Sequence, residues 1–480
     1  MKELLERALN VAKAAGASHA EARIVTRTSE NYEVRNGAPV SATHGTGRGL
    51  GVRAIADGAW GFGAVQELSP AGAERAARLA VEVARASATA HREPVVLAAA
   101  PQVDGTYVTP HRLDPIDVPV EEKLNLLVRA ERAMQGRPKV RITQSFLMVL
   151  RTHTLFANTE GSRFDQTILE CGGGITATAV EHGESQVRSY PNSFRGNFAT
   201  AGFEFFTGLD LEAHAPRVAE EAEALLSAPV CPAGRRDVII EGGQLALQVH
   251  ESIGHPIELD RVFGTEAAYA GTSFLTTDKL GSFRYGSEHV NVVADATVPG
   301  GLGTFAWDDE GVAAQCVPII EGGRFVGYIS DRESAARLGT ASTGAARAQS
   351  AGAIPLVRMT NINLLPGDWA FDDLLADTDD GLYLVTNRSW SIDDRRINFQ
   401  FGTEAAYEVR GGKLGTMYKN PTYTGITPEF WGSCDAACNE QHWKLWGTPN
   451  CGKGEPGQMA HVGHGVAPAR FRNVQVGVVR

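Results

Sequence analysis

The chain has 480 residues, of which 43% are hydrophobic and 21% are charged, a balance typical of a globular protein with two or three domains. Its formal net charge of −11, without any basic block, argues against a nucleic acid or an anionic membrane surface as a partner. No apolar run reaches the length of a transmembrane helix, and residues 1–7 are unlike a signal peptide, so we expect a cytoplasmic protein. Six cysteines in a chain of this length do not form a disulfide framework.

The N-terminal residues combine helical and strand patterns. Apolar residues recur at helical spacing over 3–15, and Ser69-Pro70 is typical of the cap and first turn of a second helix. Between these helices, period-two alternation predicts strands over residues 20–28, 30–35, 50–56 and 59–65. Asp57-Gly58 separates the last two strands and predicts a β-hairpin.

Residues 90–118 are rich in proline and alanine, and we expect them to form a connecting segment. Helical periodicity resumes over 119–134 and again over 211–226. Between these two helices we expect strands over residues 140–150, 153–158, 163–171, 174–181 and 184–188. Pro229 and Pro232 then interrupt the chain, and we place a domain boundary there.

The chain therefore divides into two predicted domains, an N-terminal α+β domain of residues 1–230 and a C-terminal domain of residues 231–480. The second domain begins with a strand over 237–241, followed by a helix from Gln244. Further strands are predicted over residues 382–391, 396–410 and 413–418. We expect an α+β fold in which the C-terminal domain is mainly β, with a closed or highly curved sheet packed against that helix.

This helix carries His250-Glu251-Ser252-Ile253-Gly254-His255, which places two imidazoles and one carboxylate within six residues. Zinc hydrolases bind the metal through neutral imidazoles and leave one position for water. Histidines four residues apart share a helix face, but a spacing of five places them about 140° apart on a regular helix. The motif therefore needs an irregularity, either a π-bulge that absorbs the extra residue or unwinding at Gly254, before Pro256.

Glu251 directly follows the first histidine, which is the position of the general base in HExxH metalloproteases. A His-Glu pair followed by another histidine also arises by chance in many chains. The spacing alone therefore leaves metal binding open.

A catalytic zinc ordinarily has three protein ligands, so a third residue is needed. The candidates in the same half are several carboxylates and His289, Cys316, Cys434, Cys438, His442, Cys451, His461 and His464. Cys451 lies in a predicted glycine-flanked loop, where the backbone can approach a site closely. Spacing does not choose among these residues, and a role for Cys451 as a small buried residue also stays open.

Four segments form a recognisable set: HESIGHP at 250–256, AYAGTSF at 268–274, IPLVRMTN at 354–361 and NCGKG at 450–454. Together they resemble the TldD/PmbA family of metallopeptidases, in its TldD-like, metal-bearing form. The resemblance extends over essentially the whole chain. It implies a zinc-dependent protease in which His250, His255 and Cys451 hold Zn²⁺ and Glu251 activates the water.

The resemblance also implies an active site inside a cavity that dimerisation closes. The partner would be a PmbA/TldE-like subunit or a second copy of the chain, and we expect the substrate cleft and the dimerisation surface in residues 1–230. The expected substrates are unfolded or extended peptides, whose backbone can pair with a sheet edge. No nucleic acid, membrane or further cofactor is expected.

The C-terminal part departs from the family pattern at residues 431–446 and near the end of the chain. Histidines and cysteines without an assigned role lie there: Cys434, Cys438, His442, His461 and His464. They offer a second metal site or an alternative third ligand. Two other functions stay open, a non-catalytic subunit that scaffolds a partner's active site and a structural-zinc protein in which a fourth ligand such as His464 closes the site.

Overall fold

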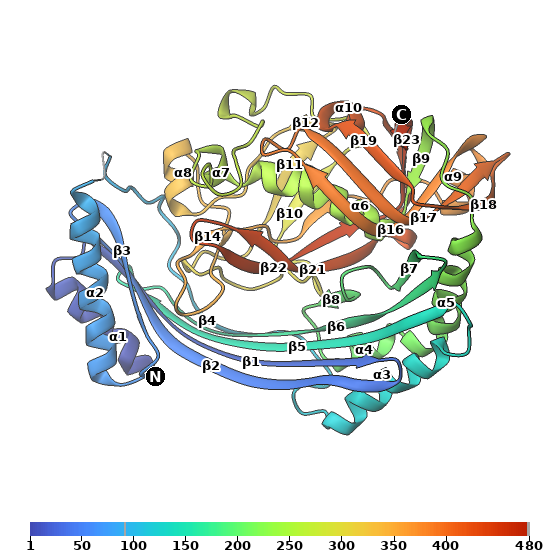
Figure 1. Cartoon of the computed structure of the whole chain (residues 1–480). Coiled ribbons are helices and arrows are strands. Elements are labelled where there is room, and N and C mark those ends of the chain that lie inside the picture. The colour runs from blue at the N-terminus through green and yellow to red at the C-terminus, as the bar shows by residue number, and fades with distance from the viewer. Residues whose placement is uncertain (91–92, 478–480) are drawn as a thin grey trace.

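The computed structural model describes residues 1–90 and 93–477. The N-terminal strands form a long curved sheet, and the C-terminal half lies against the concave side of that sheet (Figure 1). Helices cover the two ends of the sheet: α1 (Lys2–Ala14) and α2 (Pro70–Ala88) at one end, and α3 (Val120–Met134), α4 (Phe203–Gly208) and α5 (Leu211–Ser227) at the other. The α+β class predicted from the sequence is confirmed.

Within the described residues, the N-terminal sheet has eight strands in the order β3-β2-β1-β5-β6-β4, with β7 and β8 also paired to β6. Their bounds are β1 (His19–Arg35), β2 (Ala38–Ala56), β3 (Ala59–Val65), β4 (Asp104–Val108), β5 (Val140–Asn158), β6 (Arg163–Glu181), β7 (Glu184–Tyr190) and β8 (Asn197–Ala199). The strand β4 runs parallel to β6, so the prediction of a plain connecting segment over 90–118 is wrong at this point. This short edge strand is half exposed and its sequence carries little apolar signal.

The central strands are longer than predicted, because β1 has 17 residues and β5 and β6 have 19 each, where the sequence suggested two shorter strands. The first part of β1 is buried on both faces. Ala22 packs in the core beneath α1 and α2, while Arg23 forms an ion pair at 2.8 Å with Asp309 of the C-terminal half. A strand covered on both faces loses its period-two pattern, so the alternation changes although the strand continues.

The predicted turn and cap signals of this region are confirmed. Asp57-Gly58 joins β2 to β3, and the flanking residues Ala56 and Ala59 pair across the hairpin. The helix α2 begins at Pro70, and the Ser69 hydroxyl accepts a hydrogen bond from the Gly72 N–H at 3.1 Å. This side-chain cap satisfies one of the unpaired donors of the first turn.

The C-terminal half contains a closed sheet, as predicted. Five strands pair in a ring, because β16 pairs with both β9 and β17 in the order β16-β9-β23-β19-β17. Their bounds are β9 (Gly234–Ile240), β16 (Asp380–Ile392), β17 (Asn398–Arg410), β19 (Thr422–Ile426) and β23 (Ala469–Val476). Two further strands extend this sheet, β18 (Lys413–Lys419) and β20 (Cys434–Ala437).

Smaller sheets and short helices complete the C-terminal half. The strands are β10 (Val292–Asp295), β11 (Cys316–Glu321), β12 (Arg324–Phe325), β13 (Ala346–Arg347), β14 (Leu356–Val357), β15 (Ile362–Leu364), β21 (Lys444–Lys453) and β22 (Gln458–Val466). The helices are α6 (Gly242–Val249), η1 (His250–Gly254), η2 (His255–Ile257), α7 (Leu259–Val262), η3 (Thr277–Lys279), α8 (Arg332–Leu338), α9 (Phe371–Ala376), α10 (Thr427–Gly432) and η4 (Glu440–His442). No helix in the described part of the chain is long and apolar enough to cross a membrane.

The continuous helix formed by α6, η1 and η2 packs one face into the main C-terminal core. Leu245, Val249, Ile253 and Ile257 recur every four residues along it and are fully buried there. The residues of the histidine motif, His250, Glu251 and His255, instead line a cavity beside this helix.

Candidate metal centre

The turn that contains the motif is a π-helix, η1, over His250–Gly254. The His255 N–H donates to the His250 carbonyl oxygen, five residues back, so the wide turn absorbs the extra residue of the spacing. The ring centroids of His250 and His255 lie 4.9 Å apart. Of the two predicted irregularities, the π-turn is therefore the one that forms, and the helix continues past Gly254 to Ile257.

Close packing on both sides holds this turn in place. A Cβ atom at Gly254 would lie 2.2 Å from the Met359 sulfur, so only glycine fits there without movement. On the same turn, the Trp431 indole N–H donates to the Ser252 hydroxyl at 2.9 Å, and the Tyr285 hydroxyl donates to the Ser252 carbonyl oxygen. The backbone of the π-turn is thus hydrogen-bonded from outside the helix.

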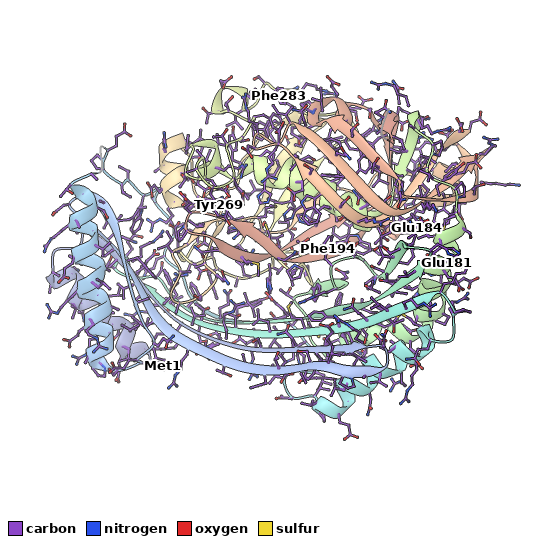
Figure 2. All side chains as sticks on the ribbon, viewed as in Figure 1. Met1, Glu181, Glu184, Phe194, Tyr269 and Phe283 are labelled. Atoms are coloured by element: carbon purple, nitrogen blue, oxygen red, sulfur yellow. The ribbon has the colours of Figure 1, made fainter. Side chains whose placement is uncertain are left out.

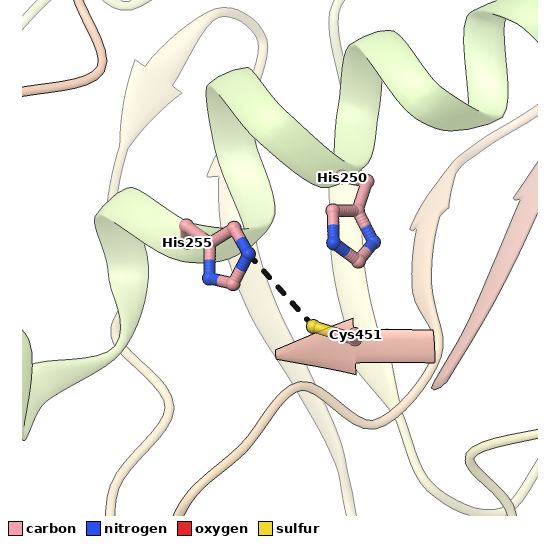
Figure 3. Close-up of side chains that lie close together, drawn as sticks. All are labelled: His250, His255 and Cys451. Atoms are coloured by element: carbon pink, nitrogen blue, oxygen red, sulfur yellow. Dashed lines mark hydrogen bonds between the residues drawn. The ribbon is translucent and has the colours of Figure 1, made fainter. Parts of the chain in front are cut away.

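Cys451 faces both histidines from the strand β21 (Figure 3). Its Sγ lies 3.8 Å from His255 Nε2, and one ligand atom from each of the three residues lies within 4.8 Å of the others. All three side chains are buried. The predicted glycine-flanked loop is wrong, because Cys451 pairs with Ala460 in the β21–β22 hairpin and Arg358 donates to its carbonyl oxygen.

Each histidine has a partner at Nδ1. The His464 Nδ1 lies 3.3 Å from the Ile362 carbonyl, which can only accept, so His464 Nε2 is left to accept from His250 Nδ1–H at 2.8 Å. His255 Nδ1 lies 3.0 Å from the Glu258 carboxylate, which accepts its hydrogen bond and so fixes the Nδ1–H tautomer of the His255 ring as well. These partners leave Nε2 of both rings available to a metal ion, and such hydrogen bonds at the other ring nitrogen are usual for metal-binding histidines.

The surroundings favour the metal-binding protonation states. Burial lowers the pKa of His250, and it lowers the pKa of His255 well below the ordinary value, so both rings stay neutral. Burial alone would raise the pKa of the Cys451 thiol, but its interactions with His255 and Arg358 hold that pKa below the ordinary value. Burial raises the pKa of the other cysteines: Cys171, Cys231, Cys316, Cys434 and Cys438.

Glu251 and the candidate ligands line one cavity of 280 Å³. The Arg396 guanidinium donates to the Glu251 carboxylate at 2.6 Å, and both side chains are largely buried. The walls come from both halves of the chain, with Ser193 and Phe194 from the segment after β7, and Trp446 from β21. Two imidazoles, a thiol group and a carboxyl group thus line one cavity.

The remaining candidate ligands lie elsewhere. His289 and Cys316 are exposed, Cys434 and Cys438 are buried in apolar clusters, His442 accepts a hydrogen bond from the Phe371 N–H, and His461 pairs with Glu170. Sequence reasoning missed the roles of Glu258, His464, Arg358 and Arg396. The role of Glu258 could have been found in the sequence, because a carboxylate three residues after His255 can reach its ring. The role of His464 could not, because 214 residues separate it from His250.

The curved sheet, the closed barrel and the buried histidine–histidine–cysteine group define an α+β protein with a candidate metal centre. Models of the PmbA/TldA metallopeptidase domain 1, central domain and C-terminal domain match residues 20–84, 113–226 and 233–478. The chain therefore belongs to the PmbA/TldD metallopeptidase family.

Named relatives agree with this assignment. A metalloprotease of Methanocaldococcus jannaschii is 30% identical over 453 residues, which cover 93% of this chain and 94% of the relative. A zinc metalloprotease TldD homolog of Saccharolobus solfataricus is 31% identical over 196 residues, which cover 41% of this chain and 42% of that protein.

Two solved structures share the fold. A candidate modulator of a DNA gyrase from Thermotoga maritima superposes with a TM-score of 0.77 at 18% identity and covers 99% of this chain and 100% of its own. TldE from Thermococcus kodakarensis superposes with a TM-score of 0.71 at 15% identity and covers 99% and 100%.

Proposed function

We propose that the protein is a zinc-dependent peptidase whose metal ligands are His250, His255 and Cys451 and whose general base is Glu251. The observation that carries the proposal is the convergence of these four side chains on one cavity, with both ring Nε2 atoms free. The relatives described as a metalloprotease and a zinc metalloprotease support the same reaction class.

The donor set fits zinc. Two neutral imidazoles and one thiolate are ligands that Zn²⁺ prefers, and three protein ligands leave a position for water. When bound there, the ion would supply Lewis-acid polarisation of a scissile carbonyl and of a water molecule. The lowered pKa of each of the three groups supports metal binding, because the two rings need not lose a proton and the Cys451 thiol gives up its proton more readily than an ordinary cysteine.

Glu251 is placed to move the proton in this reaction. Its carboxylate lines the cavity beside His250, and Arg396 holds one carboxylate oxygen at 2.6 Å. The carboxylate takes the proton of the attacking water and returns it to the nitrogen of the leaving amine. Arg396 is a positioning residue, because it fixes the direction of the carboxylate within the cavity.

We infer that the substrate is an unfolded or extended peptide. The cavity of 280 Å³ accommodates a short stretch of chain and excludes a folded domain. Its walls come from both of the domains that we propose, residues 1–230 and 231–480. We further propose that a second subunit closes the cavity, either a PmbA/TldE-like protein or another copy of this chain, as membership of the PmbA/TldD family suggests.

A structural-zinc subunit is the alternative function. It needs a fourth protein ligand, such as His464. In the structure His464 contacts the Nδ1 side of the His250 ring, which opposes a direct role in binding the metal. Glu251 inside the cavity, beside the ligands, favours the catalytic reading over both the structural and the scaffolding alternatives.

The test uses Glu251→Gln, which keeps the size of the side chain and removes the base. We expect the variant to retain its zinc and to lose cleavage of an unstructured peptide by at least about a hundredfold, the usual contribution of a general base. Glu429→Gln, a change in α10 outside the cavity, serves as the control. Near-native cleavage by Glu251→Gln would remove Glu251 from the mechanism.

A further inference from the structure

We propose that Phe194 and Trp390 form a subsite for an uncharged, aromatic or large apolar side chain of the peptide, next to the bond that is cut. This inference rests on the proposed peptidase function and names the side chain that the site selects. Both residues line the cavity that contains Glu251 and the candidate ligands, so a side chain that packs against them lies beside the reacting groups.

The two rings meet at the solvent-facing side of the cavity. Phe194 is 47% exposed and Trp390 is 41% exposed, which is unusual for large aromatic residues. Their ring centroids are 5.1 Å apart in an edge-to-face arrangement at 85°. They come from opposite halves of the chain, and Figure 2 shows Phe194 between the N-terminal sheet and the C-terminal strands. An aromatic guest can add to this pair with the same edge-to-face geometry.

The backbone that presents Phe194 is strained. Phe194 and the next residue, Arg195, have positive φ angles of 53° and 77°, in a region that bulky side chains rarely adopt. Arg195 is held by its guanidinium, which lies 4.5 Å from the ring centroid of Phe146. Strain of this kind persists only where the surroundings enforce it, and it concentrates at functional sites. Here the strained pair directs an apolar ring to the edge of the cavity rather than into a core.

The charge of the cavity indicates which side chain it accepts. Among the described lining residues, Glu251 carries the carboxylate and Arg396 carries the guanidinium group. These two groups neutralise each other in an ion pair at 2.6 Å. A charged guest side chain that packs against the two rings would therefore lose part of its hydration without gaining an ion-pair partner among the lining side chains. An apolar guest would bury its surface against the two rings, so the site discriminates against charge.

Unpaired polar atoms in the same walls can hold the peptide backbone. The Trp446 indole nitrogen, the Asn387 side-chain oxygen and the Ser193 hydroxyl are buried and have no hydrogen-bond partner in the described structure, and all three residues line the cavity. Buried polar groups are ordinarily paired, so unpaired ones demand an explanation. The indole N–H matches a peptide carbonyl and the amide oxygen matches a peptide N–H. The cavity thus offers backbone partners together with an apolar side-chain site.

The experiment uses the zinc-loaded full chain and unstructured Gly/Ser peptides that carry a single variable residue: Phe, Leu, Ala, Asp or Lys. Cleavage positions are mapped by mass spectrometry and kcat/KM is measured for each peptide. We expect cleavage beside Phe or Leu, favoured over Asp and Lys by at least about tenfold, the discrimination an apolar pocket provides. Phe194→Ala and Trp390→Ala should each reduce this preference ratio, whereas Leu414→Ala, an equally exposed apolar residue on β18, should leave it unchanged.

A binding measurement separates this inference from the peptidase proposal. Fluorescence polarisation measures the binding of labelled Phe and Asp peptides to the Glu251→Gln protein, which does not cleave them. The Phe peptide should bind more tightly than the Asp peptide. If no peptide is cleaved but the Phe peptide binds preferentially, the peptidase function fails and the subsite stands. Equal cleavage and equal binding of the Phe and Asp peptides would overturn the subsite. A changed oligomeric mass of Trp390→Ala with an unchanged preference ratio would also overturn it, because the rings would then be a subunit contact.

Discussion

Each histidine of the candidate metal centre has a neighbour that fixes which ring nitrogen carries the proton. His464 accepts a hydrogen bond from Nδ1 of His250, and the Glu258 carboxylate accepts one from Nδ1 of His255. Nε2 of His255 faces the Cys451 sulfur. Lys453 lies 3.4 Å from Glu258 and 2.6 Å from Asp260, so a buried network continues behind the second histidine. Metal affinity should therefore depend on residues that never touch the metal.

His464→Ala tests this dependence at the first histidine. Without an acceptor at His250 Nδ1, the ring can adopt the wrong tautomer or rotate, and we expect zinc affinity to fall about 10–100-fold. His464→Gln, whose amide oxygen can accept the same hydrogen bond, should recover part of the loss. Affinity is measured by competition with a chromophoric chelator, and the exposed His289→Ala is the matched control. An unchanged affinity in His464→Ala would show that the contact has no orienting role.

The sequence predicted the chemistry of individual residues better than their surroundings. The types and spacing of His250, Glu251 and His255 pointed to a metal and to an irregular helix, and the π-turn confirms the second point. Cys451 was placed in a loop because glycines such as Gly452 and Gly454 follow it, yet strand pairing with β22 positions it. The sequence offered His464 as a possible ligand but not as the hydrogen-bond partner of His250, because only the tertiary fold brings the two rings together.

At the scale of elements, the π-turn depends on the absence of a side chain at Gly254. Gly254→Ala would place a Cβ 2.2 Å from the Met359 sulfur, so we expect a loss of about 1–3 kcal/mol in the free energy of unfolding and weaker zinc binding. Gly254→Ala combined with Met359→Ala should recover part of the zinc binding, because the clash is removed. Urea unfolding and zinc titration measure the two effects.

A matched glycine provides the control for this experiment. Gly432 is the last residue of α10, and a Cβ added there would have no atom within 4 Å. Gly432→Ala should therefore change neither the free energy of unfolding nor the zinc binding. Equal stability of Gly254→Ala and the wild type would show that the helix can shift without disturbing the turn.

The helix α3 carries a second testable feature, the buried carboxyl of Glu131. It accepts from the Gly37 N–H at 3.3 Å and from the Thr143 hydroxyl, which joins α3 to the β1–β2 turn and to β5. Burial raises the pKa of Glu131 from 4.5 to about 7. The carboxyl therefore takes up a proton on folding, and stability is lost as the pH rises from 4.5 to 7.

Glu131→Gln removes the charge and should make the protein more stable than the wild type at pH 8, by up to about 3 kcal/mol. At pH 4.5 the difference should be small, because the wild-type carboxyl is then neutral in the folded state. Urea unfolding at both pH values measures the effect, with the exposed Glu122→Gln on the same helix as the control. A difference that does not depend on pH would contradict this explanation.

At the scale of the whole molecule, buried ion pairs join the N-terminal sheet to the C-terminal half. Arg53 on β2 contacts Glu21 of β1 at 2.8 Å and Glu310 of the other half at 2.5 Å. Arg53→Ala would leave two buried carboxylates without their partner, so we expect a loss of about 3–5 kcal/mol in stability. Arg7→Ala breaks an exposed pair with Glu74 and should have little effect by the same urea measurement.

The architecture at this scale was only partly predictable. The turn signals at Asp57-Gly58 and the cap at Ser69 identified local elements correctly, because their causes are local. The length of β1 was not predictable, because contacts with the C-terminal half, such as that of Arg23 with Asp309, bury the second face of the strand. The residues next to Arg23 in the sequence give no sign of this burial. The sequence likewise predicted a closed or curved sheet but not the pairing of β16 with both β9 and β17 that closes it.

The central claim is that His250, His255 and Cys451 hold a catalytic zinc. Its most direct test is the metal content of the purified full chain and of Cys451→Ala by mass spectrometry, alongside cleavage of an unstructured peptide. We expect about one zinc per wild-type chain, the stoichiometry of a single three-ligand site. We expect Cys451→Ala to lose both the zinc and the cleavage, while Cys434→Ala, a buried cysteine outside the cavity, keeps both. Full zinc retention in Cys451→Ala would contradict the claim.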